Sequence, residues 1–252
     1  MSDSPTRPEG AAEARPGLPT IDVHEYGGRR DGERQVLNRR LFMQLLVFRA
    51  PGDSSELAAR TTSALREAGL GSVVYADTMD PRGFGLLTWS EQPTDFVTKV
   101  RPLFAGPLAG AELRPELAMI GRSYSIGHEP DLEHGLLRRP VDNVLNAAYP
   151  WHVWYPLRRN GPFNRLDPHE QSIILREHAS IGMAYGQQEL AHDIRLACHG
   201  LDSADNEFVI GLVGRELHPL SHLVQTMRKT RQTAEFIAQM GPFFVGHVLA
   251  RG

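Results

Sequence analysis

Hydrophobic and polar positions follow the same order in the two halves of the chain. In the first half an unbroken apolar stretch predicts a buried strand, and apolar residues at helical spacing follow it up to Gly69. A strand pair comes next, joined by Asp80-Pro81-Arg82-Gly83, where proline and glycine favour a turn. The predicted elements are strand 41–48, helix 54–68, strands 72–76 and 84–89, helix 94–104 and strand 117–125. This β-α-β-β-α-β order is that of a ferredoxin-like domain.

The second half repeats this order after a hinge that we expect over residues 128–146. Its predicted elements are strand 151–157, helix 168–185, strands 194–198 and 208–213, helix 220–240 and strand 243–249. The predicted fold class is therefore α+β, with tandem ferredoxin-like repeats whose antiparallel sheets are flanked by helices and packed into one body. We expect an N-terminal domain over 34–130 and a C-terminal domain over 131–252.

The first residues differ from the rest of the chain. Residues 1–33 are rich in proline, glycine, serine and charged side chains. Such a segment buries too little apolar surface to offset the entropy lost on ordering. We therefore expect a flexible N-terminal arm, with a part near residues 21–26 held against the body of the protein.

Composition excludes several classes of partner. The chain has 252 residues, of which 41% are hydrophobic and 23% charged, and its formal net charge is −3. This charge gives no electrostatic reason to expect nucleic acid or an anionic membrane as a partner. No apolar stretch approaches the roughly 20 residues that cross a bilayer, and no secretion signal is recognisable. The single cysteine, Cys198, cannot form an internal disulfide and suits a reducing compartment, so we expect a cytoplasmic protein.

One helix of the second half carries a histidine among isoleucines. Asp167 and Pro168 begin it, because the carboxylate caps free N–H groups and proline loses no hydrogen bond at the first helical position. Ile174, His178 and Ile181 then fall at i, i+4 and i+7 and share one face. A core histidine bonded to a backbone carbonyl would explain this pattern. So would the protein ligand of a haem iron, since the porphyrin supplies four ligands and the isoleucines would contact it.

Five landmarks of the second half resemble, in order and spacing, those of the chlorite dismutase and coproheme decarboxylase superfamily. They are Tyr155-Pro156-Leu157-Arg158-Arg159, His178 in Arg-Glu-His, Gly200-Leu201-Asp202, Met227-Arg228 and Gly241-Pro242-Phe243-Phe244-Val245-Gly246. The interval from Tyr155 to His178 is most similar to that of actinobacterial coproheme decarboxylases. Motif residues are shared over residues 150–250, and the order of strands and helices is shared over residues 40–250. It implies a dimeric α/β-barrel fold, one haem in the C-terminal half and a homo-oligomer, typically a homopentamer.

The resemblance implies a role for three residues, and strand alternation adds a fourth. His178 matches the proximal iron ligand, and Tyr155 matches the tyrosine that becomes a radical and takes an electron from a coproheme propionate. Arg159 matches a basic residue that holds a propionate, as a guanidinium suits a carboxylate. Trp151 shares the strand face of Tyr155, so we expect it in the pocket wall. The structural alternatives are a core aromatic for Tyr155 and a solvated charge for Arg159.

The chain departs from the family pattern on the distal side of the haem. Chlorite dismutases carry an arginine there, on the strand after the histidine helix. Counting forward from His178 gives Ala191 in this place, whereas counting back from Gly200 gives Asp193. The segment is about two residues longer than the pattern, and a bulge would bring Arg195 over the iron. All three residues remain candidates.

Two further positions bear on the proximal side. Phe163 stands where family members often have a tryptophan. The proximal histidine is usually hydrogen-bonded by a carboxylate or backbone group, which raises its basicity. Gln232 and Glu235 are the candidates for this partner of His178, and the sequence does not separate them.

Four functions are compatible with these residues. The first, which we expect, is peroxide-driven oxidative decarboxylation of iron coproporphyrin III to haem b, with the tetrapyrrole as both substrate and cofactor. The second is chlorite decomposition, or another peroxidase-type reaction at resident haem, with Arg195 as the distal guanidinium. The third is a haem carrier or sensor without turnover. The fourth is a ferredoxin-like interaction module without haem.

Overall fold

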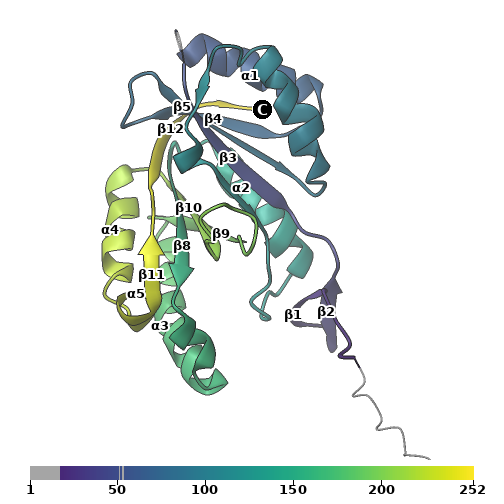
Figure 1. Ribbon diagram of the computed structural model, residues 1–252. Coiled ribbons are helices and arrows are strands. Elements are labelled where there is room, and N and C mark those ends of the chain that lie inside the picture. The colour runs from purple at the N-terminus through teal and green to yellow at the C-terminus, as the bar shows by residue number, and fades with distance from the viewer. Residues whose placement is uncertain (1–17, 51, 53) are drawn as a thin grey trace, which may run out of the picture.

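Antiparallel strands close into a barrel in the computed structural model, which describes residues 18–50, 52 and 54–252 (Figure 1). The order β8-β10-β9-β7-β3-β5-β4-β12 returns to β8, because β8 pairs with both β10 and β12. The barrel strands are β3 (Phe42–Arg49), β4 (Ser72–Asp77), β5 (Gly83–Ser90), β7 (Met119–Arg122), β8 (Trp151–Arg159), β9 (His192–Ala197), β10 (Phe208–Gly214) and β12 (Phe244–Arg251). The short strands β6 (Glu112–Leu113) and β11 (Ile237–Met240) pair with β3 and β8.

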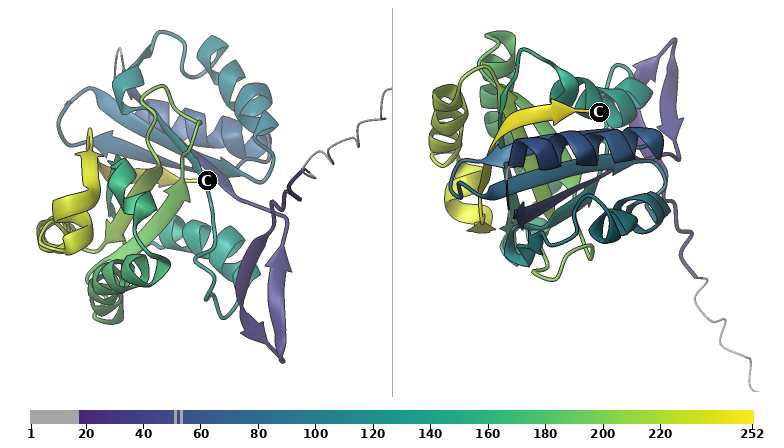
Figure 2. Two further views of the ribbon diagram at one scale, coloured as in Figure 1. Left: turned by 60° about the horizontal axis from the view of Figure 1, so that its bottom comes forward. Right: turned by 90° about the horizontal axis from the view of Figure 1, so that it is seen from above.

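Each half of the barrel is one ferredoxin-like repeat, as predicted. The neighbouring strands are β7-β3-β5-β4 in one repeat and β12-β8-β10-β9 in the other. Numbered along the chain within its repeat, each set has the spatial order 4-1-3-2. The helices are α1 (Ser54–Glu67), η1 (Phe96–Val100), η2 (Arg101–Ala105), η3 (Pro115–Leu117), η4 (His134–Arg138), α2 (Arg139–Leu145), η5 (Gly161–Arg165), α3 (Pro168–Gln187), α4 (Leu217–Met227) and α5 (Arg231–Phe236). Helix α1 covers the outside of the N-terminal strands, and α3 and α4 lie on the C-terminal half (Figures 1 and 2).

The two seams between the repeats are unequal. Strand β12 joins β4 through five residue pairs, from Gly246 with Asp77 to Arg251 with Val73. The opposite seam joins β7 to β9 through one pair, Arg122 with Ala197. The repeats are therefore held together mainly on the β12 side.

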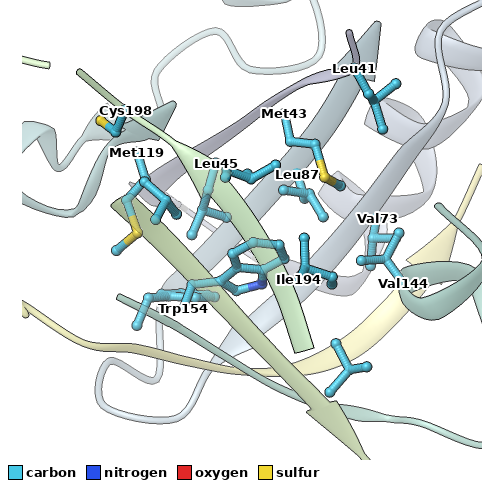
Figure 3. Close-up of a cluster of buried hydrophobic side chains, with 14 of the residues drawn as sticks. Leu41, Met43, Leu45, Val73, Leu87, Met119, Val144, Trp154, Ile194 and Cys198 are labelled. Atoms are coloured by element: carbon cyan, nitrogen blue, oxygen red, sulfur yellow. The ribbon is translucent and has the colours of Figure 1, made fainter. Parts of the chain in front are cut away.

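The barrel interior is a single apolar core to which both repeats contribute. Alternate residues of each strand point inward, so Met43 and Leu45 of β3 meet Trp154 of β8 and Ile194 of β9 (Figure 3). Val144 of α2 joins the same core. The two repeats thus share one hydrophobic core, and the domain boundaries 34–130 and 131–252 stay a prediction.

Glycines make room for the largest side chain of this core. Trp154 is 1% exposed, and its ring packs against Gly211 of the neighbouring strand β10. A Cβ atom at Gly211 would lie 2.6 Å from the indole ring, which is closer than side chains normally approach. The position therefore requires a residue without a side chain.

Gly211→Ala is expected to lower the free energy of unfolding by about 1–3 kcal/mol, because the added methyl group overpacks the core. Gly161→Ala is the matched control, since nothing lies within 4 Å of a Cβ at that position. Chemical denaturation of both variants measures the difference. Equal midpoints for the two would show that the barrel relaxes around the methyl group.

Several predicted elements were wrong. Residues 220–240 do not form one helix: α4 ends at Met227, Thr230 caps the new helix α5, and Ile237–Met240 pair with β8. The predicted hinge over 128–146 contains η4 and α2, and Leu136 and Leu137 of η4 and Val144 of α2 enter the barrel core.

The predicted flexible arm over 1–33 was also wrong in part. Residues 1–17 lie outside the described residues, but β1 (Glu25–Arg30) and β2 (Glu33–Leu37) form a hairpin. Glu25 anchors it through ion pairs with Arg40 and Arg122, at 3.1 and 3.2 Å. Among residues 18–50, 52 and 54–252, none of the helices combines the length and apolar character needed to cross a bilayer.

Candidate functional site

The outer face of the C-terminal strands forms one wall of the candidate site. Trp151, Val153 and Tyr155 alternate along β8 and belong to an apolar cluster that α3 and α4 cover. His152 and Trp154 point the other way, into the barrel. The strand alternation predicted from the sequence is therefore correct.

Strand register places two charged residues on the same wall. Tyr155 pairs with Ile210, which pairs in turn with Arg195, so their side chains emerge on one face. Asp193 lies two residues before Arg195 on β9, pairs with Leu212 of β10 and is on the same face. The β9–β10 pairing runs without a register shift, so the predicted bulge is absent and Arg195 reaches this face by alternation alone.

Helix α3 supplies the opposite wall. Its start is as predicted, because the Asp167 carboxylate accepts a hydrogen bond of 2.8 Å from the His169 N–H. Ile174 packs with Phe163 in one apolar cluster, and Ile181 belongs to the cluster of Tyr155. His178 lies between them on the helix and is half-buried.

A threonine fixes the hydrogen position on the His178 ring. Nδ1 of His178 lies 3.4 Å from the hydroxyl oxygen of Thr230, which is buried. That hydroxyl has two acceptors, the Met227 carbonyl at 2.8 Å and the Thr233 hydroxyl at 3.3 Å. Because its one hydrogen goes to the nearer of these, it accepts from the imidazole. The hydrogen therefore lies on Nδ1, and the lone pair of Nε2 is available to a metal.

The electrostatic surroundings keep His178 neutral. Burial lowers the pKa of His178 below its ordinary value, and the positive charge of Arg195 adds to this effect. Asp193 and Glu177 act in the opposite direction but do not cancel it. A neutral imidazole is the form that binds a metal ion.

Tyr155 is a buried phenol packed against an aromatic ring. It is 6% exposed, and its ring stacks on Phe243 with centroids 4.5 Å apart. Burial raises the pKa of Tyr155, with a further contribution from Asp193 and opposition from Arg228. The phenol thus stays protonated.

Arg195 is held by an ion-pair network. Its Nε lies 2.9 Å from one carboxylate oxygen of Asp193, and Arg139 of α2 lies 2.5 Å from the other. Burial acts to raise the pKa of Asp193, but the two guanidinium groups outweigh it and lower the pKa. The third distal candidate, Ala191, is buried in the cluster of Tyr155 and Val153.

Arg159 lies on the expected strand but already has an anionic partner. Its Nε donates to Glu207 at 3.0 Å, and its guanidinium stacks between Phe163 and Phe208, 4.6 and 4.8 Å from the ring centroids. Its side chain is 15% exposed, so it is not a solvated surface charge. A propionate at this place would have to exchange with Glu207.

The remaining predicted residues are distributed around the site. Trp151 lies at the edge of the Tyr155 cluster, edge-on to His247 with centroids 4.8 Å apart. The carboxylate of Glu235 pairs with Arg231, and the buried side-chain oxygen of Gln232 has no hydrogen-bond partner, so neither carries a hydrogen bond to His178 through these oxygens.

Thr230 was not predicted from the sequence, and Phe243 was interpreted as a packing residue alone. The spacing Thr-x-x-Thr from Thr230 to Thr233 is typical of a helix N-cap and could have indicated Thr230. It lies inside a stretch that was interpreted as one continuous helix. Phe243 lies in the recognised Gly-Pro-Phe-Phe landmark, but its stacking on Tyr155 depends on a contact distant in sequence.

These residues fit the tetrapyrrole that the family resemblance implies. A neutral histidine with a free Nε2 faces an apolar wall that carries a phenol and a guanidinium. Within the described part of the chain, no three His, Cys, Asp or Glu side chains gather as a metal-binding group. His178 therefore suits an iron whose other ligands come with its porphyrin.

The fold and site define a class of protein: a closed barrel of tandem ferredoxin-like repeats with one histidine-centred apolar site on its C-terminal half. Residues 139–249 match the family model described as chlorite dismutase. No curated protein sequence matches the chain.

Two solved structures extend the comparison to the whole barrel. A haem-binding protein from Thermus thermophilus is 20% identical, with a TM-score of 0.63 over 84% of this chain and 92% of that one. A chlorite dismutase from Candidatus Nitrospira defluvii in complex with imidazole is 14% identical, with a TM-score of 0.64 over 82% and 90%. Residues 139–249 of the chain thus resemble the chlorite dismutase family in sequence, and the barrel shares its fold with these two structures.

Proposed function

We propose that the chain binds a haem-type tetrapyrrole through His178 and is a haem-dependent oxidoreductase of the coproheme decarboxylase kind. The observation that carries this proposal is the state of His178. Its Nδ1–H is held by Thr230, its Nε2 is free, and its face of α3 looks onto the wall that contains Tyr155.

The proposed substrate is iron coproporphyrin III, and the oxidant is hydrogen peroxide. Bound tetrapyrrole supplies an iron that reacts with peroxide and the propionates that are consumed. Each propionate with one hydrogen peroxide and one proton gives a vinyl group, carbon dioxide and two water molecules. Two such reactions produce haem b.

The residues of the chain have distinct parts in this reaction. His178 holds the iron, and the apolar side chains of α3, α4 and β8 exclude water from it. Tyr155 gives up its electron and proton to the peroxide that is being reduced, and then regains an electron and a proton as the propionate is oxidised. Arg159, after exchange with Glu207, holds a propionate. Trp151, Ile174 and Ile181 contact the porphyrin.

Incubation with iron coproporphyrin III and hydrogen peroxide, followed by mass spectrometry, tests this function. The expected result is loss of two carboxyl groups from the porphyrin. A Soret band without this conversion would favour a haem carrier or sensor. A colourless protein that takes up no tetrapyrrole would refute the proposal and favour an interaction module.

Chlorite decomposition is the second candidate function, favoured by the position of Arg195 on the wall of Tyr155. Ala191 offers no charge to an oxyanion, and the Arg195 guanidinium is engaged by Asp193. We therefore expect slow oxygen release from chlorite, with bleaching of the haem within few cycles. Arg195→Ala is expected to leave that slow rate nearly unchanged. Fast, sustained oxygen release that Arg195→Ala abolishes, measured with an oxygen electrode, would favour the second function instead.

A homo-oligomer, of the pentameric type that the family resemblance implies, is part of the proposal. Helix α3 supports it, since Ile173, Leu175 and Met183 expose 49, 40 and 61% of their surface. A neighbouring protomer would cover such apolar side chains. A cytoplasmic location is proposed from the lone cysteine, Cys198, which is buried and unpaired.

A further inference from the structure

A hydrogen-bonded aromatic pair lies inside the barrel, on the opposite face of β8 from the candidate site. The hydroxyl of Tyr75 lies 2.9 Å from Nδ1 of His152, and the two rings are 5.0 Å apart. Both residues are fully buried. Nothing in the proposed reaction uses them.

The direction of this hydrogen bond follows from the other nitrogen of the ring. Nε2 of His152 lies 3.1 Å from the Tyr149 carbonyl oxygen, which can only accept, so Nε2 carries the hydrogen. Burial lowers the pKa of His152 to about 3, so the ring is neutral and Nδ1 has a lone pair. The Tyr75 hydroxyl therefore donates to His152.

Trp154 connects this pair with the candidate site. It precedes Tyr155 directly in the chain, and its side chain points inward where that of Tyr155 points outward. Burial raises the pKa of the Tyr75 hydroxyl, whereas the indole N–H of Trp154, which has no hydrogen-bond partner, acts to lower it. The ring of Phe244 lies edge-on to Tyr75 at 5.8 Å and completes the aromatic cluster.

A buried tyrosine loses an electron readily only when its proton has an acceptor. Tyr75 has such an acceptor in His152, within hydrogen-bond distance and without competition from water. Among the described residues two other tyrosines contact histidines, but the Tyr149 hydroxyl donates to the Glu189 carboxylate, and Tyr185 contacts the exposed ring of His222. Tyr75 is thus set apart by its dry surroundings.

We propose that Tyr75 is a redox-active tyrosine that loses one electron towards a tetrapyrrole bound at His178 while its proton passes to His152. The O–H bond of Tyr75 breaks, an N–H bond forms at Nδ1 of His152, and the electron travels by Trp154 and Tyr155. Hydrogen peroxide is the final acceptor, taking two electrons and two solvent protons to give two water molecules. Tyr75 supplies one of these electrons, and Tyr155 or the substrate supplies the other. The inference rests on tetrapyrrole binding but not on decarboxylation.

Freeze-quench electron paramagnetic resonance of the haem-loaded full chain, mixed with hydrogen peroxide, tests the inference. We expect a tyrosyl radical with the lowered g-value of a hydrogen-bonded phenoxyl, narrowed by ring-deuterated tyrosine. Tyr75→Phe should lose this component, whereas the comparison variants Tyr149→Phe and Tyr185→Phe should keep it. A component that persists in Tyr75→Phe, or that disappears in Tyr185→Phe, would overturn the inference.

Two further measurements test the inference if Tyr75→Phe does not fold or if the protein binds no haem. Site-specific 3,5-difluorotyrosine at position 75 keeps the hydroxyl and adds fluorine hyperfine splitting only if this residue carries the radical. In haem-free protein, azidyl radicals oxidise tryptophan, and Tyr75→Phe should slow the transfer of the radical from tryptophan to tyrosine. Unchanged transfer there would reject Tyr75 as redox-active, while a missing Soret band would reject only the proposed function.

Discussion

His178→Ala is expected to lower tetrapyrrole affinity by more than about 100-fold while the protein stays folded. The side chain offers the free Nε2 of the candidate site, and the described residues provide no second metal-binding group nearby. His178 is only half-buried, so its loss removes little core packing. Soret titration measures the affinity, and circular dichroism measures the fold.

His169→Ala is the matched control for this experiment, since His169 lies on the same helix but is exposed in its first turn. Its affinity for the tetrapyrrole should equal that of the unaltered protein. If His178→Ala retained the same ferric spectrum and affinity, another residue would have to hold the iron.

Tyr155→Phe is expected to bind the tetrapyrrole normally but to lower decarboxylation by at least about 100-fold. The phenyl ring keeps the stacking on Phe243 but cannot supply an electron coupled to a proton. Product formation measured by mass spectrometry, beside a Soret titration, separates the two effects.

Tyr26→Phe serves as the control, because Tyr26 lies on β1 and bonds to Asp22, away from the site. It should convert substrate at the rate of the unaltered protein. Undiminished conversion by Tyr155→Phe would mean that Tyr155 is a structural aromatic.

The features predicted correctly from sequence are those set by local spacing. Alternation along β8 placed Trp151 with Tyr155 on one face and Trp154 on the other. The cap at Asp167 fixed the start of α3, and helical spacing placed His178 between Ile174 and Ile181. Each of these depends on residues within two or three turns of one another.

The features that were missed depend on contacts between distant parts of the chain. The helix pattern over 220–240 gave no sign that Ile237–Met240 would pair with β8, so the cap at Thr230 and its bond to His178 stayed hidden. Arg139 lies in a segment expected to be a hinge, yet it shares Asp193 with Arg195. The distal candidates could therefore be named from the sequence but not separated.

The unequal seams of the barrel have a mechanical consequence. With five residue pairs joining β12 to β4 and one joining β7 to β9, the structure has a stiff side and a compliant side. A fluctuation that separates β7 from β9 breaks few backbone hydrogen bonds and leaves the strand pairing within each repeat intact. Strand β9, which carries Asp193 and Arg195, borders this compliant side. We therefore expect Asp193 and Arg195 to move more easily than Tyr155 when a ligand enters. Tyr155 lies on β8, which is paired on both sides with β10 and β12.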